Sequence, residues 1–192
     1  VNASSEQGLL AVNGMSYQAR DGENANSALI VTVTPEDFPE EGALGGIAFQ
    51  RDLEKKAWEL GKGKVPVQLF GDFCAHQPSS QLGEIHPNIK GGYVLTDVRS
   101  ILPKELGDSI EEGIFAFGKK LSGFDRKDAV LSGIESRTSS PVRLVRDQKG
   151  LSNITGIYPC GEGAGYAGGI TSAAMDGIKT AEWIASEYMM KL

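Results

Sequence analysis

The most informative stretch of this chain is GEGAGYAGG, residues 161–169. It follows an apolar run, residues 154–158, that favours a strand, and it precedes a segment with helical periodicity that starts at Ile170. Glycine lets a ligand approach the main chain without a Cβ in the way. The first N–H groups of a helix have no partner within the helix and point toward a ligand under the positive end of the helix dipole. The order of strand, glycine loop and helix start therefore predicts a site for a phosphate or for the anionic edge of a ring.

Composition and charge limit the classes of protein to which the chain can belong. With 192 residues, 40% of them apolar, it can bury a sizeable core in one or two domains. Its net charge of −6 argues against a general nucleic-acid binder, which needs a basic surface. The sequence shows no signal peptide and no apolar segment of membrane-spanning length. We therefore expect no nucleic-acid partner, no membrane span and a cytoplasmic location.

Hydrophobic periodicity predicts a mixture of strands and helices without strict alternation, which favours an α+β fold whose last segment belongs to an α/β layer. The predicted helices cover residues 47–60, 103–121 and 170–190, and the predicted strands cover residues 9–12, 15–19, 28–34, 65–70, 129–134, 142–145 and 154–158. Asn13-Gly14 predicts a hairpin turn between the first two strands. Residues 71–92 are expected to form a long surface excursion that could border a pocket.

The last predicted helix has apolar residues at helical spacing. They are Ile170, Ala174, Ile178, Ala181 and Ile184. Because these positions share one face, we expect that face to point into the protein interior.

The glycine loop contains a formal dinucleotide fingerprint, Gly163-x-Gly165-x-x-Gly168. A true fingerprint is followed about 20 residues later by a second parallel strand that carries an acid for the ribose. The sequence ends at Leu192 inside the predicted helix, so this requirement is not met. Two alternatives stay open: a loop that contacts the flavin end of FAD, and a tight strand-to-helix connection with glycines for packing only. In the first, Glu162 accepts hydrogen bonds from ribityl hydroxyls.

Two longer stretches carry a family resemblance. Residues 156–178, GIYPCGEGAGYAGGITSAAMDGI, closely resemble the C-terminal signature of a bacterial family of uncharacterised FAD-dependent dehydrogenases. Residues 134–143, IESRTSSPVR, resemble that family's second signature, although Ser136 stands where threonine is more usual. Shorter matches are Asn13-Gly14-Met15-Ser16, Ala25-Asn26-Ser27-Ala28 and Phe49-Gln50-Arg51.

The resemblance implies an organisation and a function. Family members have an N-terminal FAD-binding segment with the fingerprint, then an inserted substrate-facing domain, then a return to the FAD domain. On this pattern residues 1–141 are the inserted domain, with a mixed β-sheet and helices, and residues 142–192 are the return segment, a strand, loop and helix of a Rossmann-like FAD domain. The chain is then a piece of a longer FAD-dependent oxidoreductase, a dehydrogenase, in which the flavin carries the hydride. Its expected partners are a small-molecule substrate and an electron donor such as NAD(P)H.

The same resemblance implies which residues lie against the cofactor or substrate. The predicted cofactor-binding residues are Arg137, Thr138, Ser139, Gly161, Glu162, Gly163, Ala164, Gly165, Gly168, Gly169 and Ile170. A guanidinium and several hydroxyls suit an anionic substrate or the charge of a reduced flavin. From composition alone, residues 137–140 are also compatible with a plain polar loop before Pro141. No general acid or base is identifiable; Tyr166, Glu135 and His76 are unranked possibilities.

The remaining reactive side chains give weaker signals. Cys74, His76 and His86 lie close in sequence but lack the fourth ligand or the supporting shell of a zinc site, so no metal is predicted. Cys160 adjoins the glycine loop and is expected to be a small buried hydrophobe, although redox activity with the cofactor stays open. The alternative to an enzyme is a non-catalytic ligand-binding module on a flavoprotein scaffold.

Overall fold

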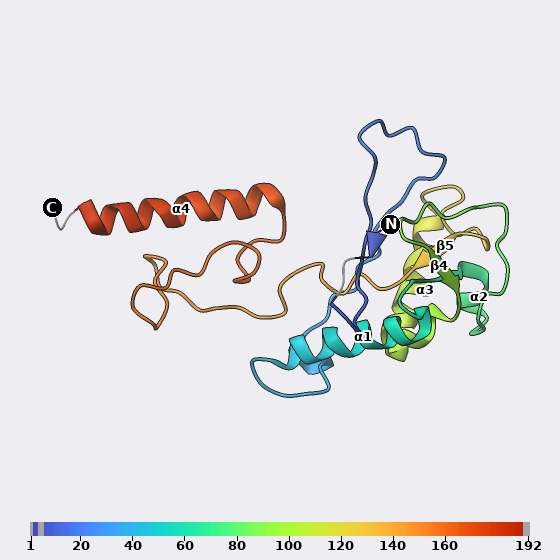
Figure 1. The fold of residues 1–192 in the computed structure, drawn as a ribbon, viewed down its shortest axis with the longest axis horizontal. Helices are drawn as coiled ribbons and strands as arrows, with labels where there is room; N and C mark the ends of the chain where they lie inside the picture. Colours follow the sequence, from blue (N-terminus) through green and yellow to red (C-terminus); the bar gives the residue numbers. More distant parts are fainter. Residues whose placement is uncertain (1, 4–5, 190–192) are drawn as a thin grey trace. The chain divides into compact units, whose positions relative to one another are not determined.

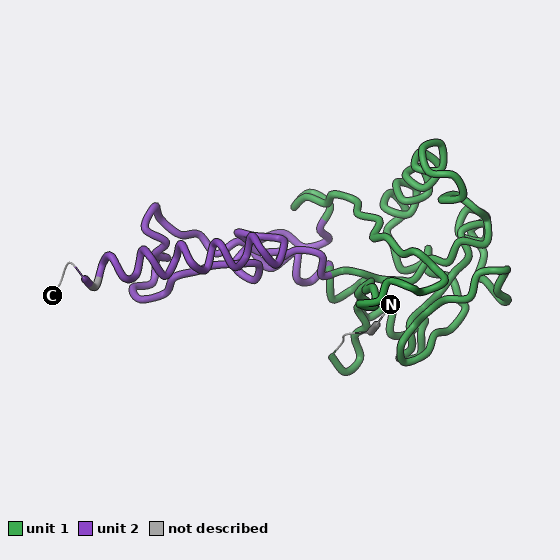
Figure 2. Tube along the Cα trace, turned by 90° about the horizontal axis from the view of Figure 1, so that it is seen from above, with its two compact units in different colours: residues 1–37, 50–136 green, residues 38–49, 137–192 purple. Residues whose placement is uncertain are grey.

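The protein is represented by a computed structural model that describes residues 2–3 and 6–189. Its Cα trace separates into two compact units, coloured in Figure 2: unit 1 comprises residues 1–37 and 50–136, and unit 2 comprises residues 38–49 and 137–192. Each unit is described by itself below. The predicted boundary between a substrate-facing domain and a return segment at residue 141 stays a prediction.

Unit 1 is built on a three-stranded mixed sheet (Figure 1). The central strand β3, Val65–Leu69, pairs in parallel with β4, Tyr93–Leu95, and antiparallel with β5, Val130–Ser132. The register places Val67 opposite both Leu95 and Ser132. The first four residues of β3 are buried, as expected of a strand in the middle of a sheet.

Helices and a 3₁₀ turn supply the rest of the core of unit 1. They are α2, Phe70–Cys74, the turn η2, Val98–Ile101, and α3, Lys104–Gly118. Phe70, Phe73, Ile101 and Ile114 from these elements are at most 2% exposed. Pro103 is the N-cap of α3, where the missing proline N–H is harmless. A further 3₁₀ turn, η1, covers Pro35–Asp37.

Helix α1, Gly45–Gly61, runs across the division between the units, which falls after Phe49. Its buried side chains within unit 1 are Leu53, Glu54 and Ala57. The helix predicted over residues 47–60 is thereby confirmed. After it, Lys62 and Gly63 take positive φ values of 50° and 79°, which turn the chain into β3.

The predicted hairpin at Asn13-Gly14 is wrong. The structure instead pairs β2, Val12–Asn13, antiparallel with β1, Asn2–Ala3, and residues 15–19 form no strand. Two longer-range bonds explain the difference: the Val12 N–H donates to the carbonyl of Ile134 at 2.9 Å, and the Leu10 N–H donates to the carbonyl of Glu54 at 3.0 Å. Tertiary contacts therefore position this segment, and the local turn preference does not.

Unit 2 consists mainly of turns and loops followed by one helix, α4, Ile170–Met189. The predicted helix over residues 170–190 is confirmed up to Met189; Met190 lies outside the described residues. The predicted strands over residues 142–145 and 154–158 are not formed, and neither is the strand over 28–34 in unit 1. The described residues thus show a mixed α/β fold with one three-stranded sheet and four α-helices, and the Rossmann-like part of the predicted fold class stays a prediction.

The prediction that the face of α4 with Ile170 and Ile178 points into the protein interior is also wrong. Ile170 is 94% exposed and Ile178 is 63% exposed. The less exposed face instead carries Asp176, Thr180 and Trp183. Asp176 bonds to Arg146 and Gly161, and Trp183 lies against Gly150. None of the helices within residues 2–3 and 6–189 has both the length and the apolar character needed to cross a membrane.

Candidate functional site

The glycine loop forms a closed turn. The Tyr166 N–H donates to the carbonyl of Gly161 at 3.0 Å, and the Gly165 N–H donates to the carbonyl of Glu162 at 2.8 Å. At the base of the loop, the Gly161 N–H donates to the carboxylate of Asp176 on α4 at 2.9 Å. The loop is therefore held in one conformation by bonds inside it and by the helix that follows.

The glycines of the loop fall into two groups. Gly161 and Gly165 have positive φ values of 71° and 80°, and a Cβ on Gly165 would lie 2.6 Å from the carbonyl oxygen of Val142. These two glycines are required by backbone conformation and by a close approach of two segments. At Gly163 and Gly168 nothing lies within 4 Å of the Cβ position, so the main chain there is open to a ligand. Backbone conformation and packing thus account for Gly161 and Gly165, whereas a ligand-facing role for Gly163 and Gly168 stays a prediction.

The loop leads directly into the first turn of α4. Gly168, Gly169 and Ile170 are exposed, and the Ser172 hydroxyl lies 3.2 Å from the Gly169 nitrogen and 3.0 Å from its carbonyl oxygen. The first N–H groups of an α-helix have no acceptor within the helix and carry the positive end of its dipole. This end of the loop therefore offers donors and a favourable potential to an anionic group.

A partly buried ion pair lies at the base of the loop. Arg146, 9% exposed, donates to both carboxylate oxygens of Asp176, at 2.6 and 2.9 Å, and also to the carbonyl of Pro159 at 2.8 Å. The hydrogen bond from Arg146, followed by that from the Gly161 N–H, lowers the pKa of Asp176 from 3.8 to about 2. The carboxylate is consequently ionised across the physiological range.

Sequence reasoning missed both members of this pair. Arg146 stands in a polar segment between two predicted strands that do not form, and Asp176 stands inside the C-terminal signature without a stated role. The available signal was an acid at the seventh residue of the helix that follows the glycine loop. A residue there lies on the same helix face as residue 173, one turn earlier, and so near the loop.

The predicted residues 137–139 lie close in sequence to a segment that runs along the glycine loop. The Ser140 hydroxyl is 2.9 Å from the carbonyl oxygen of Val142 and 3.2 Å from that of Gly163, and the Leu144 N–H donates to the carbonyl of Ala164 at 3.2 Å. Arg137, Thr138 and Ser139 are themselves exposed. The structure thus brings the segment that follows them into contact with Gly163 and Ala164, and their own contact with a cofactor stays a prediction.

Ser136, the last residue of unit 1, forms hydrogen bonds with two side chains of α1. Its hydroxyl donates to the Glu54 carboxylate at 2.7 Å, and the Gln50 side chain donates to its carbonyl at 2.8 Å. Glu54 is 1% exposed, so this hydroxyl is one of the groups that satisfy a buried acid. The hydroxyl that serine shares with the more usual threonine therefore has a structural role here.

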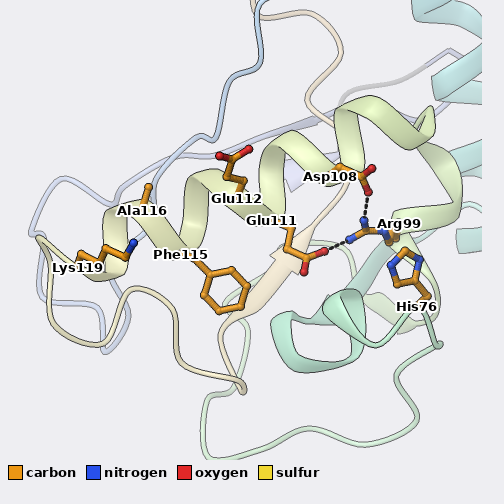
Figure 3. A pocket seen from close by; sticks show the side chains of 8 residues that line it. All are labelled: His76, Arg99, Asp108, Glu111, Glu112, Phe115, Ala116 and Lys119. Atoms are coloured by element: carbon orange, nitrogen blue, oxygen red, sulfur yellow. Dashed lines mark hydrogen bonds and ion pairs between the residues drawn. The ribbon is translucent and has the colours of Figure 1, made fainter.

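Unit 1 has a separate groove, of about 570 Å³, along α3 and the end of α2. Figure 3 shows the guanidinium of Arg99 between the carboxylates of Asp108 and Glu111, with His76 beside it and the ring of Phe115 further along α3. Arg99 is 8% exposed and also lies over the ring of Phe73. His76 has a positive φ of 53°, which is uncommon for a residue with a side chain. The groove therefore combines fixed charges with an exposed aromatic ring.

The two cysteines differ in their surroundings. Burial, with a smaller effect of Glu111, raises the pKa of Cys74. Cys160 is exposed, so the prediction that it is a buried hydrophobe is wrong. It sits between Pro159 and Gly161, both of which bond to the ion pair, and this holds its main chain at the surface. Within the described part of the chain, no three His, Cys, Asp or Glu side chains are grouped to hold a metal ion.

Comparison with known proteins places the chain in a family. Residues 1–138 match the family described as "FAD-dependent protein, C-terminal domain-like". The chain belongs to this family. The matched residues include all of unit 1 and stop before the glycine loop of unit 2.

A curated relative extends the similarity through the loop. An uncharacterized protein of Clostridium beijerinckii is 52% identical over 191 residues, which is 98% of this chain. The chain spans 36% of the length of that relative. The family description supports a flavoprotein-related domain with FAD as the associated cofactor.

Proposed function

We propose that this chain is the substrate-domain and flavin-facing part of an FAD-dependent oxidoreductase of the dehydrogenase type. The observation that carries the proposal is the glycine loop of residues 161–169, which is closed by internal hydrogen bonds, open to solvent at Gly163 and Gly168, and continuous with the first turn of α4. The family description supplies the cofactor.

Three features of the loop support a flavin contact. Its open glycines let a planar ring or a ribityl chain reach the backbone, and the exposed Glu162 carboxylate can accept hydrogen bonds from ribityl hydroxyls. The N–H groups at Ile170 and in the turn after it would face the pyrimidine edge of the isoalloxazine. Because that edge becomes negatively charged on reduction, the helix dipole would favour the reduced state.

The chemistry divides between cofactor and protein. When bound, the flavin accepts and donates the hydride. The residues of this chain supply position and electrostatics: Gly161 and Gly165 shape the loop, the start of α4 supplies positive potential, and the Arg137–Ser139 stretch of the second signature is proposed to line the flavin or substrate face.

The groove on α3 is the proposed substrate-contacting surface of unit 1. Its volume of about 570 Å³ falls in the range of small-molecule sites, and its lining includes the ring of Phe115 and the carboxylates of Glu111 and Glu112. Phe115→Ala, which removes the exposed ring, is expected to raise KM for the substrate more than it lowers kcat, because the ring contributes binding area and no reactive group.

The decisive experiment uses the full-length product of the gene. We expect purified protein to be yellow, to bleach when NAD(P)H or another reductant is added without oxygen, and to regain its colour with an electron acceptor. Colourless protein that takes up no flavin when FAD is added would overturn the proposal. Protein that binds FAD but shows no reduction by any donor would favour the non-catalytic binding module. The 192-residue chain alone is expected to bind FAD weakly, since no fingerprint for the ADP end precedes the loop in this sequence.

A further inference from the structure

We propose that Arg146 and Asp176 are positioning residues that set the conformation of the flavin-facing loop, and through it the affinity and reduction potential of the flavin. This inference rests on the proposed function. Neither residue is expected to touch the reacting atoms. Both act through the backbone of residues 159–166.

The pair holds the two peptide groups on either side of Cys160. Arg146 donates to the carbonyl of Pro159 at 2.8 Å, and Asp176 accepts from the N–H of Gly161 at 2.9 Å. The same two side chains also bond each other through two hydrogen bonds. Pro159, just before the loop, and Gly161, its first residue, are therefore held by one bonded pair of side chains.

The far end of the loop is attached to the same arginine. The guanidinium of Arg146 lies 3.6 Å from the ring centroid of Tyr166, and the backbone N–H of Arg146 donates to the Tyr166 hydroxyl at 3.1 Å. Tyr166 in turn donates its N–H to the carbonyl of Gly161. Entry and exit of the 161–166 turn therefore converge on Arg146, while Glu162 and Gly163 remain exposed.

The geometry distinguishes this pair from an ion pair that only adds stability. Surface pairs contribute little, and buried pairs gain little net stability over apolar replacements. Here Arg146 is 9% and Asp176 14% exposed, and two groups use the charges as hydrogen-bonding partners: the Pro159 carbonyl and the Gly161 N–H. These bonding groups belong to the loop or to the residue pair at its start. We therefore infer that the ion pair determines the conformation of the loop backbone.

The chain contains a matched control. Arg143 also places its guanidinium over the Tyr166 ring, at 4.3 Å, but it is exposed. R143M removes a cation from the same aromatic ring and the same segment. R146M removes a cation that also bonds Asp176 and Pro159. The two variants therefore separate loss of a cation–π contact from loss of the loop's attachment.

The test measures the dissociation constant of FAD and the flavin reduction potential in full-length protein. We expect R146M and D176N to weaken FAD binding by about tenfold or more and to shift the potential, since a hydrogen bond to a charged group is about the size of a tenfold change in affinity. R146K keeps the charge but cannot form the two-bond contact, so it should fall between R146M and wild type. R143M should remain within about twofold of wild type. D176N, nearly equal in shape to aspartate, serves if R146M fails to fold.

Amide hydrogen exchange of flavin-free full-length protein supplies an independent measurement. We expect faster exchange in the peptide covering residues 159–166 for R146M and D176N, and no change for R143M. Wild-type FAD affinity in both R146M and D176N, or equal effects of R146M and R143M, would overturn the inference and leave the proposed function intact. If wild-type protein binds no FAD, the proposed function fails, and unchanged exchange in R146M would then overturn the loop attachment as well.

Discussion

Two buried arginines, one in each unit, show how differently the two parts of this chain are stabilised. Arg99 of unit 1 pairs with Asp108 and Glu111 of α3 and lies over the ring of Phe73; Arg146 of unit 2 pairs with Asp176 of α4 and lies over the ring of Tyr166. The local construction is nearly the same in both: a guanidinium at most 9% exposed, helix carboxylates and an aromatic ring.

The surroundings of the two arginines differ. Unit 1 contains a hydrophobic core in which Phe70, Phe73, Val65 and Val67 are at most 1% exposed. Among the described residues of unit 2, the buried apolar side chains are Phe49, Pro159 and Ala164, and most apolar side chains of α4 are exposed. Arg99 therefore adds specificity to a packed core, whereas Arg146 is part of a polar framework that itself determines the loop. A unit without its own core depends on further surface to cover its apolar helix face.

The largest expected effect tests the core of unit 1. Phe73→Ala should destabilise this unit by about 3 to 5 kcal/mol, because it removes a large, fully buried side chain and leaves a cavity. Urea unfolding followed by circular dichroism measures the change. Phe117→Ala, at a position 46% exposed, is the control and should cost much less. Equal effects of the two substitutions would contradict the location of the core.

The next prediction concerns the loop of unit 2. Gly165→Ala should destabilise the loop by about 1 to 3 kcal/mol, because residue 165 has a positive φ and the added Cβ would meet the Val142 carbonyl. Gly163→Ala is the matched control, since its Cβ would enter open space. Amide exchange of residues 159–169 measures both. Exchange that increases equally in the two variants would show that the loop conformation described here is wrong.

The pH dependence of unit 2 should follow Asp176. Its pKa is lowered to about 2 in the folded protein from 3.8, so the ion pair contributes its full stabilisation above about pH 4 and loses it as the pH falls through about 2. Trp183, over which Arg146 and Lys179 lie, reports the change by fluorescence in a Trp58→Phe background. D176N should remove the transition, and a transition of the same midpoint in D176N would assign it to another acid.

The smallest expected effect tests the exposed face of α4. Ile178→Ser should change the stability of the 192-residue chain by no more than about 0.5 kcal/mol, because the side chain is 63% exposed. Leu53→Ser, at a position 5% exposed in α1, should destabilise the chain strongly. Thermal unfolding distinguishes the two. A large loss of stability in I178S would mean that this face is covered, and the contrast between the two units would then disappear.

Local sequence signals predicted the elements whose formation depends on nearby residues. The spacing of apolar residues was sufficient for α1, α3, α4 and β3, and the glycines of residues 161–169 marked the loop at the start of α4. The same signals failed where the formation of a strand depends on pairing with another segment of the chain. The β-branched stretch of residues 28–34 forms no strand, and Val12 pairs with Ala3 instead of with residues 15–19. Strand formation needs a neighbouring strand, which periodicity alone does not reveal.

The sequence by itself determined that a glycine loop precedes a long helix, and that one stretch with a family resemblance contains this loop while a second precedes it, since these depend on residue identity and order. Only the tertiary structure decided what holds the loop: Arg146 and Asp176 are 30 residues apart, and their pairing depends on the course of the backbone between them. It also decided which glycines are needed for conformation and which leave the backbone open, because that distinction depends on the position of Val142 beside Gly165. The physical reason is the same in both cases: hydrogen bonds and steric contacts act over a few ångströms in space, whatever the separation along the chain.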